Sequence, residues 1–218
     1  MIVDMRHEDL DSYVSKLFDA GADMIQFRDP DAPLAQIGAA VVAAQQAALT
    51  RNKLVAVTGD LVLAKAVMAD VLIGGPSLDP GLAHGRLHEY ALVGLPVFNP
   101  ADLYSIGSSQ DVDFALVGPV YMAAGSLAPA PGLPLIREAA AAIPAGDPSG
   151  TPWFAVGGVT ASNIGEVIDA GARRAGLVVT GDADLAAVAA VSSALHASWD
   201  ADPDLKDFAF RVLSGGAG

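Results

Sequence analysis

The chain has no cysteine among its 218 residues and few basic side chains. Without cysteine it can form no disulfide bond and no thiolate metal site, and it has no cysteine nucleophile. Lys and Arg number 12 against 25 Asp and Glu, which gives a formal net charge of −13. We therefore expect no nucleic-acid partner, because phosphate contacts need clustered basic side chains. The acidity is better explained by solubility than by an acidic–basic partnership.

Long apolar segments and an N-terminal targeting signal are also missing. The most apolar stretch, residues 37–49, contains two glutamines and is too short to span a bilayer. The N-terminus carries Asp4, Glu8 and Asp9 and lacks the basic-then-apolar order of a signal peptide. Hydrophobic residues make up 52% of the chain and charged residues 17%, which favours a packed core over disorder. We expect a soluble, cytoplasmic protein with no membrane partner.

What the chain does have is a regular alternation of short apolar runs and helical patterns. The predicted strands are residues 2–5, 23–27, 54–57, 71–73, 91–95, 114–117, 153–156 and 177–179. The predicted helices are residues 9–20, 32–51, 61–69, 82–89, 101–108, 133–143, 161–170 and 183–197. Strict β–α alternation indicates a parallel sheet, and eight units in this length favour a closed (β/α)₈ TIM barrel. We predict one barrel over residues 1–200 and a tail over residues 201–218, with a short helix around 205–212.

A short internal repeat supports this prediction. Asp19-Ala20-Gly21-Ala22 precedes one predicted strand, and Asp169-Ala170-Gly171-Ala172 precedes another. Each has the pattern of a helix end, a glycine stop and a buried strand. Two matches can arise by chance, but together they suggest a repeated βα unit.

Glycine turns follow the last two predicted strands. Gly157 and Gly158 follow the first of them, and Thr180 and Gly181 follow the second. Backbone N–H groups at such turns can bind a phosphate without any basic side chain. Two adjacent turns of this kind are typical of the phosphate site after strands 7 and 8 of a TIM barrel. We therefore predict a small phosphorylated ligand there; alternatively, the glycines only permit tight turns. Thr160 is the predicted N-cap of the following helix.

Polar side chains at other strand ends are further candidates. Strand alternation places Gln26 and Arg28 on the same side, where they can hold an anionic ligand; alternatively, Arg28 is tied to barrel carboxylates for structure alone. Asp60 and Asp79 are better explained as helix N-caps than as metal ligands. His84 and His88 share a predicted helix face but lack a third ligand, so a solvated face is the favoured interpretation.

The chain resembles the thiamine-phosphate synthase family, which includes the thiazole tautomerases. The resemblance covers residues 20–187 and lies mainly in AGADMIQFRD, VDFALVGPVY and FAVGGVTASNIGEVIDAGARRAGLVV. It implies a (β/α)₈ barrel. Synthases of this family join an aminopyrimidine diphosphate to a thiazole phosphate with Mg²⁺, releasing pyrophosphate. The implied thiazole-phosphate residues are Gly157, Gly158, Thr180 and Gly181, while Gln26 and Arg28 would face the pyrimidine diphosphate.

The chain departs from the synthase pattern around the reacting groups. Where synthases usually carry Lys after the Gln-x-Arg-acidic motif, this chain has Pro30. The Asn-Asp positions after the third strand are Thr58 and Gly59. The metal-binding Asp after the fourth strand is Leu78, with Asp79 one residue away.

The remaining departures are in two runs and at one tautomerase position. The His-Leu-Gly-Gln run is Ile73-Gly74-Gly75-Pro76, and the Thr-x-Thr-Lys loop is Ala123-Ala124-Gly125-Ser126. The catalytic His of the tautomerases is Pro119. Pyrophosphate departure needs positive charge and donors, so the resemblance implies a kept phosphate end and a depleted reacting end.

Three functional hypotheses follow. The first is an enzyme of thiamine biosynthesis, either a transferase or an isomerase acting on thiazole phosphate. Arg28 would then stabilise charge, Gln26 would orient the ligand, and Asp60 or Asp79 would act as base or metal ligand; Mg²⁺ is implied only if synthase activity is retained. The second is a non-catalytic, phosphate-ligand-binding or regulatory paralogue. The third is another phosphate-barrel isomerase, for which only Asp29 and Asp60 stand at strand ends. Asp29, Thr58, Asp60 and Ser126 are further pocket candidates, and the sequence is compatible with a homo-oligomer.

Overall fold

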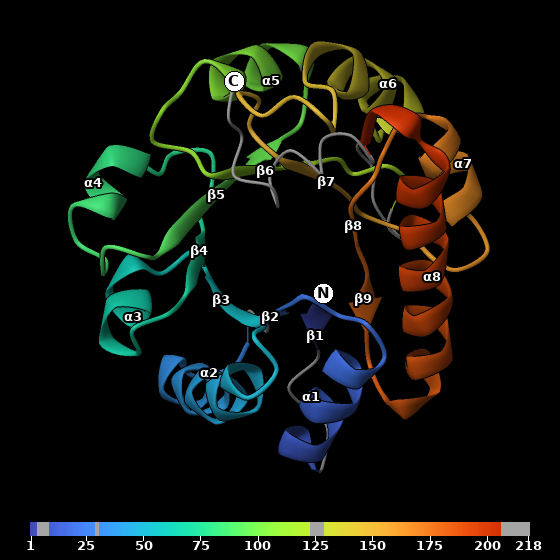
Figure 1. Ribbon diagram of the computed structural model, residues 1–218. Coiled ribbons are helices and arrows are strands. Elements are labelled where there is room, and N and C mark those ends of the chain that lie inside the picture. The colour runs from blue at the N-terminus through green and yellow to red at the C-terminus, as the bar shows by residue number, and fades with distance from the viewer. Residues whose placement is uncertain (4–8, 29–30, 123–128, 206–218) are drawn as a thin grey trace, which may run out of the picture.

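The computed structural model describes residues 1–3, 9–28, 31–122 and 129–205. Parallel strands form a closed ring inside a shell of helices (Figure 1). The strands are β1 (Ile2–Val3), β2 (Met24–Phe27), β3 (Leu54–Thr58), β4 (Val71–Ile73), β5 (Leu92–Val97), β6 (Phe114–Val117), β7 (Trp153–Val156), β8 (Ala175–Gly176) and β9 (Val178–Val179). The predicted TIM-barrel fold is confirmed.

The ring closes through the last strand, which is in two pieces. β8 pairs with β7, and β9 pairs with β1. Only Leu177 separates the two pieces, and its carbonyl accepts the N–H of Ile2 at 2.8 Å. β8 and β9 together are thus the eighth barrel strand, which starts two residues before the predicted Leu177.

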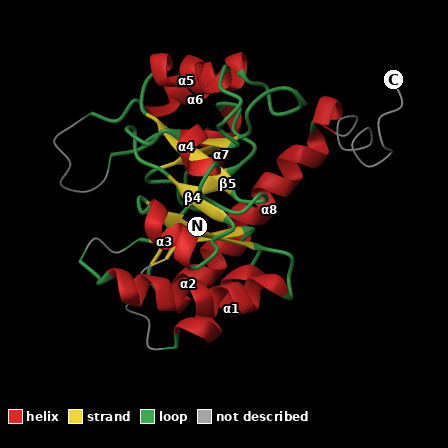
Figure 2. Cartoon of the chain, turned by 90° about the vertical axis from the view of Figure 1, so that its left-hand side faces the viewer, coloured by secondary structure: helices red, strands yellow, loops and turns green. Residues whose placement is uncertain are grey.

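The helices connect successive strands on the outside of the ring, as the side view also shows (Figure 2). They are α1 (Leu10–Asp19), α2 (Leu34–Leu49), α3 (Leu61–Ala66), α4 (Pro80–His84), α5 (Pro100–Gly107), α6 (Gly132–Ala142), α7 (Ile164–Asp169) and α8 (Leu185–Ala201), with a 3₁₀ turn, η1, at Asp182–Asp184. No helix in the described ranges has both the length and the apolar character that a bilayer span needs. The predicted helix at 205–212 lies outside the described residues except for Leu205.

Four helix predictions were wrong by three or more residues at one end. α3 ends at Ala66 rather than 69, and α8 ends at Ala201 rather than 197. α4 ends at His84 rather than 89, because Gly85 follows and the chain turns towards β5. α7 begins at Ile164, so Thr160 is not its N-cap; that position belongs to Asn163. The Asn163 side chain accepts the Thr160 N–H at 2.8 Å, which holds residues 160–163 in a turn before the helix.

The barrel interior is filled by a separate apolar cluster. Ala56, Val71, Ile73 and Phe114 form its buried centre. The Phe114 ring lies beside β5 where a Cβ on Gly94 would overlap it. Phe154 meets Phe114 edge-on, with 5.7 Å between ring centroids. The interior is therefore a packed core that supports the carboxyl ends of the strands.

The repeated sequence pattern corresponds to a repeated helix end. After α1, the Ala22 N–H donates to the Leu17 carbonyl at 3.1 Å, and Gly21 has φ +105°. After α7, the Ala172 N–H donates to the Val167 carbonyl at 3.1 Å, and Gly171 has φ +102°. This is the Schellman arrangement, in which a left-handed residue ends the helix.

The same arrangement ends α3 with Met68 instead of glycine. Met68 has φ +49°, and the Ala69 N–H donates to the Ala64 carbonyl at 2.9 Å. We expect Met68→Gly to raise the free energy of unfolding by about 0.5–1 kcal/mol, because glycine adopts this conformation without the Cβ penalty. The measurement is urea unfolding. Met68→Ala is the matched control, since it keeps the Cβ and should bring no gain; equal stability of the two variants would contradict the prediction.

Candidate functional site

The carboxyl ends of β2 and β3 bring two predicted polar residues together. The Gln26 side-chain amide donates to Thr58 Oγ1 at 2.5 Å. Gln26 is only 7% exposed, so this pair forms the polar top of the barrel interior. Arg28 follows on the same face of the chain as Gln26 and is exposed at the edge of the barrel. Asp29 and Ser126 lie outside the described residues.

The carboxylates at this edge of the barrel serve as helix caps. Asp60 Oδ1 accepts the Leu63 N–H at 2.7 Å, and Asp79 Oδ1 accepts the Leu82 N–H at 3.0 Å. Asp9 does the same at the start of α1. The favoured interpretation of Asp60 and Asp79 as N-caps is confirmed. Among the residues that the structure places, no three His, Asp or Glu side chains are close enough together to hold a metal ion.

The histidines have structural partners away from this edge. His84 Nε2 lies 3.1 Å from Asp113 Oδ2, and His88 Nε2 lies 3.0 Å from the Ala69 carbonyl. They do not share a helix face, because α4 ends at His84. A weak metal site between these two side chains is therefore not formed.

The turn after β7 is packed tightly against the segment after β6. Gly157 and Gly158 have φ of +88° and +71°. A Cβ on Gly157 would lie 2.6 Å from Pro119 Cβ, and a Cβ on Gly158 would lie 2.7 Å from Tyr121 Cβ. The Gly157 carbonyl accepts the Tyr121 N–H at 3.0 Å. The pairing of Val156 with Gly176 directs the Gly157 N–H towards β8, whereas the Gly158 N–H has no acceptor among the described residues. The glycines are thus required sterically, and the Gly158 N–H is available to an anion.

The turn after β9 is different, because its donors are already used. Asp184 Oδ2 accepts the N–H of Thr180 at 2.6 Å and the N–H of Gly181 at 3.3 Å. Thr180 Oγ1 also lies 3.3 Å from this oxygen. The sequence interpretation missed Asp184, although its position three residues after Gly181 has the spacing of a capping box. The two glycine turns follow neighbouring strands, but among the described residues only the first has an N–H group, that of Gly158, without an acceptor.

A buried tyrosine forms a hydrogen bond with the turn after β9. The Tyr13 hydroxyl on α1 donates to the Gly181 carbonyl at 2.9 Å, and the side chain is fully buried. Burial, with the charges of Asp184 and Asp182, raises the pKa of Tyr13 to about 12. The hydroxyl therefore stays protonated and holds the turn at neutral pH.

Positive charge is scarce at the carboxyl edge. In the described connections from a strand to the next helix, Arg28 is the one Lys or Arg. Most of the other basic side chains lie on helices or at the opposite edge; Arg51 pairs there with Asp19 at 2.8 Å, and Arg173 with Asp202 at 3.2 Å. The described edge therefore offers backbone donors and one guanidinium to an anionic ligand.

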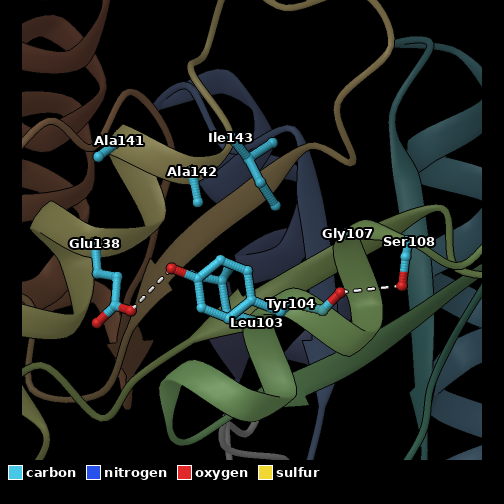
Figure 3. A pocket seen from close by; sticks show the side chains of 8 residues that line it. All are labelled: Leu103, Tyr104, Gly107, Ser108, Glu138, Ala141, Ala142 and Ile143. Atoms are coloured by element: carbon cyan, nitrogen blue, oxygen red, sulfur yellow. Dashed lines mark hydrogen bonds between the residues drawn. The ribbon is translucent and has the colours of Figure 1, made fainter.

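A cavity of about 470 Å³ lies elsewhere, on the outer surface between α5 and α6 (Figure 3). The Tyr104 hydroxyl donates to Glu138 Oε1 at 3.3 Å across it. Small residues of both helices, among them Gly107 and Ala141, form its walls. None of the predicted site residues lines this cavity.

The fold and this edge define a class: a (β/α)₈ barrel with glycine turns after its last two strands. The model of the thiamine monophosphate synthase family matches residues 1–180. The chain is 34% identical over 208 residues to a thiamine-phosphate synthase of Mycobacterium leprae. This alignment covers 87% of this chain and 86% of the relative. It is 32% identical over 171 residues to that of Acidothermus cellulolyticus, which covers 78% of each. The chain belongs to the thiamine-phosphate synthase family.

A solved structure of a thiamine phosphate pyrophosphorylase from Pyrococcus furiosus has the same fold. Its TM-score is 0.73 at 19% identity, and the match covers 90% of this chain and 95% of the other. At this identity the likeness supports the barrel fold and not the activity.

Mg²⁺, which the family's coupling reaction implies, does not fit the described residues. The carboxylates of Asp60 and Asp79 each accept an N–H of their own helix, and no three acidic or imidazole groups in the described ranges are close enough to hold a metal ion. Mg²⁺ needs a near-octahedral set of oxygen ligands, usually with one or two available carboxylates. The described residues therefore do not form a Mg²⁺ site.

Proposed function

We propose that this member of the family binds a small phosphorylated ligand, of the thiazole phosphate type, without catalysing the coupling to a pyrimidine diphosphate. The proposal rests on a contrast between two parts of the site: a backbone donor is present in the turn after β7, but positive charge is scarce where pyrophosphate would leave. The turn at Gly157 and Gly158 offers the Gly158 N–H, which has no acceptor among the described residues, for one phosphate. The end that would stabilise departing pyrophosphate has Arg28 as its one described cation.

The energetics of pyrophosphate departure support this division. Charge that develops on the leaving group must meet prearranged donors or cations, and each donor is typically worth about 10²–10³ in kcat. The family's two Lys positions are Pro30 and Ser126 in this chain, and its metal-ligand positions are Gly59 and Leu78. None of these residues carries a positive charge or a carboxylate, and Ser126 alone has a side-chain donor. Among the described residues at this edge, Arg28 alone would carry the charge.

The test measures the binding of each of the two ligands in a separate titration. We expect calorimetry to detect binding of thiazole phosphate and no binding of the aminopyrimidine diphosphate with Mg²⁺. We expect the coupling rate to be at least about 10³-fold below that of the Mycobacterium leprae relative assayed in parallel, because several donors are missing together.

Arg28→Ala decides between the hypotheses. Turnover close to that of the relative that disappears in Arg28→Ala would contradict the proposal and establish Arg28 as a catalytic residue. Absence of thiazole phosphate binding in the unmodified protein would contradict the phosphate-binding part and leave only the family fold.

A further inference from the structure

The turn after β9 already holds an anion, and this anion comes from the chain itself. One carboxylate oxygen of Asp184 accepts two consecutive backbone N–H groups, those of Thr180 and Gly181. The Thr180 hydroxyl lies 3.3 Å from the same oxygen. These are the donors that a phosphate oxygen would use in a glycine turn of this kind.

The surrounding contacts hold Asp184 in this place. Its own N–H donates to the Gly181 carbonyl at 2.9 Å, and α8 begins at the next residue. The Tyr13 hydroxyl donates to the same Gly181 carbonyl from the opposite side. These contacts fix the turn. The Gly181 carbonyl points at the Tyr13 hydroxyl, and the N–H groups of Thr180 and Gly181 point at the Asp184 carboxylate.

An external phosphate and this carboxylate cannot use the same donors together. Both are anions, and at contact distance they repel each other, most strongly where solvent screening is reduced. The neighbouring turn differs, because no described side chain accepts the N–H groups of Gly157 and Gly158. The two halves of the predicted phosphate site are therefore unequal.

We propose that Asp184 excludes phosphate from the turn after β9, so that Gly157 and Gly158 alone hold the ligand's phosphate. This inference deepens the proposed function and rests on it for the binding at Gly157 and Gly158. Asp184 is then a specificity-determining residue, which lowers the affinity for dianionic phosphate relative to ligands with less charge at this end.

The experiment is a titration of the ¹⁵N-labelled protein with inorganic phosphate, followed through the backbone amide signals of both turns. It compares the unmodified chain with Asp184→Asn, Asp184→Ala and Asp182→Asn. Asp182→Asn removes the same charge two residues away, where the side chain pairs with Lys16 at 3.2 Å. Thermal unfolding of each variant checks that it is folded.

We expect phosphate to shift the signals of Gly157 and Gly158 in the unmodified protein and to leave Thr180 and Gly181 unchanged. In both Asp184 variants, Thr180 and Gly181 should respond as well, and the Kd for phosphate should fall about tenfold or more, because freed donors and a removed like charge both favour the anion. Asp182→Asn should behave as the unmodified protein.

Two results would overturn the inference: an unchanged Kd in both Asp184 variants, or an equal change in Asp182→Asn, which would show a general charge effect. A different result concerns the proposed function. If Gly157 and Gly158 never respond while Thr180 and Gly181 respond only in the Asp184 variants, the exclusion by Asp184 is supported and phosphate binding after β7 is contradicted.

Discussion

Replacing Phe114 with alanine is expected to lower the free energy of unfolding by about 3–5 kcal/mol. Phe114 is 5% exposed, and its ring fills the barrel interior beside Gly94 and against Phe154. Gly94 offers no side chain that could move into the space. The interior of a closed ring of strands also relaxes little, so the cavity remains and its cost adds to the lost burial.

The measurement is chemical denaturation of Phe114→Ala beside Phe98→Ala. Phe98 is 48% exposed and directly follows β5, so its truncation should change the stability by no more than about 0.5 kcal/mol. Similar losses in the two variants would contradict the assignment of Phe114 to the packed centre of the barrel.

The second large effect is expected at Gly158. Gly158→Ala should cost about 2–5 kcal/mol, because a left-handed residue other than glycine is penalised by about 1–2 kcal/mol and overpacking adds about 1–3. Its Cβ would lie 2.7 Å from Tyr121 Cβ and 3.1 Å from the Tyr121 carbonyl oxygen. The turn must shift to relieve this contact, so the phosphate response of Gly157 should be lost as well.

Gly165→Ala is the matched control a few residues further along. Gly165 lies in α7, and a Cβ there would have no atom within 4 Å. Gly165 is the second residue of this helix, and Gly→Ala there is expected to stabilise by up to about 0.5 kcal/mol, because alanine loses less backbone entropy on folding. The two substitutions should therefore have opposite signs in thermal unfolding, and a neutral Gly158→Ala would contradict the packing described for this turn.

Most of the fold was predictable because its signals are local. Strand alternation, helical periodicity and glycine stops each act over a few residues, and the eight βα units follow from them. The N-cap interpretations of Asp60 and Asp79 were confirmed for the same reason, since each carboxylate accepts an N–H three residues ahead. The start of α7 was misplaced because an Asn163–Thr160 contact competed with helix formation.

The candidate site was less predictable, because its properties depend on which donors are already in use. Gly157, Gly158, Thr180 and Gly181 were proposed as equivalent donors from their types and positions. Asp184 makes them unequal, and Tyr13, which is distant in the sequence, holds that arrangement in place. Whether these turns bind phosphate remains a prediction for the titration to test.

By itself the sequence determined the alternating units, the glycine turns and the loss of the family's cationic and metal-ligand positions, because residue types and short spacings are read directly from the chain. The tertiary structure decided three features. The ring closes through β9 and β1, and the Phe114 ring packs against Gly94. The N–H groups of the turn after β9 point at the Asp184 carboxylate. Those features join residues far apart in the chain, or depend on the direction in which a backbone donor points. Only the packing of complete elements specifies them.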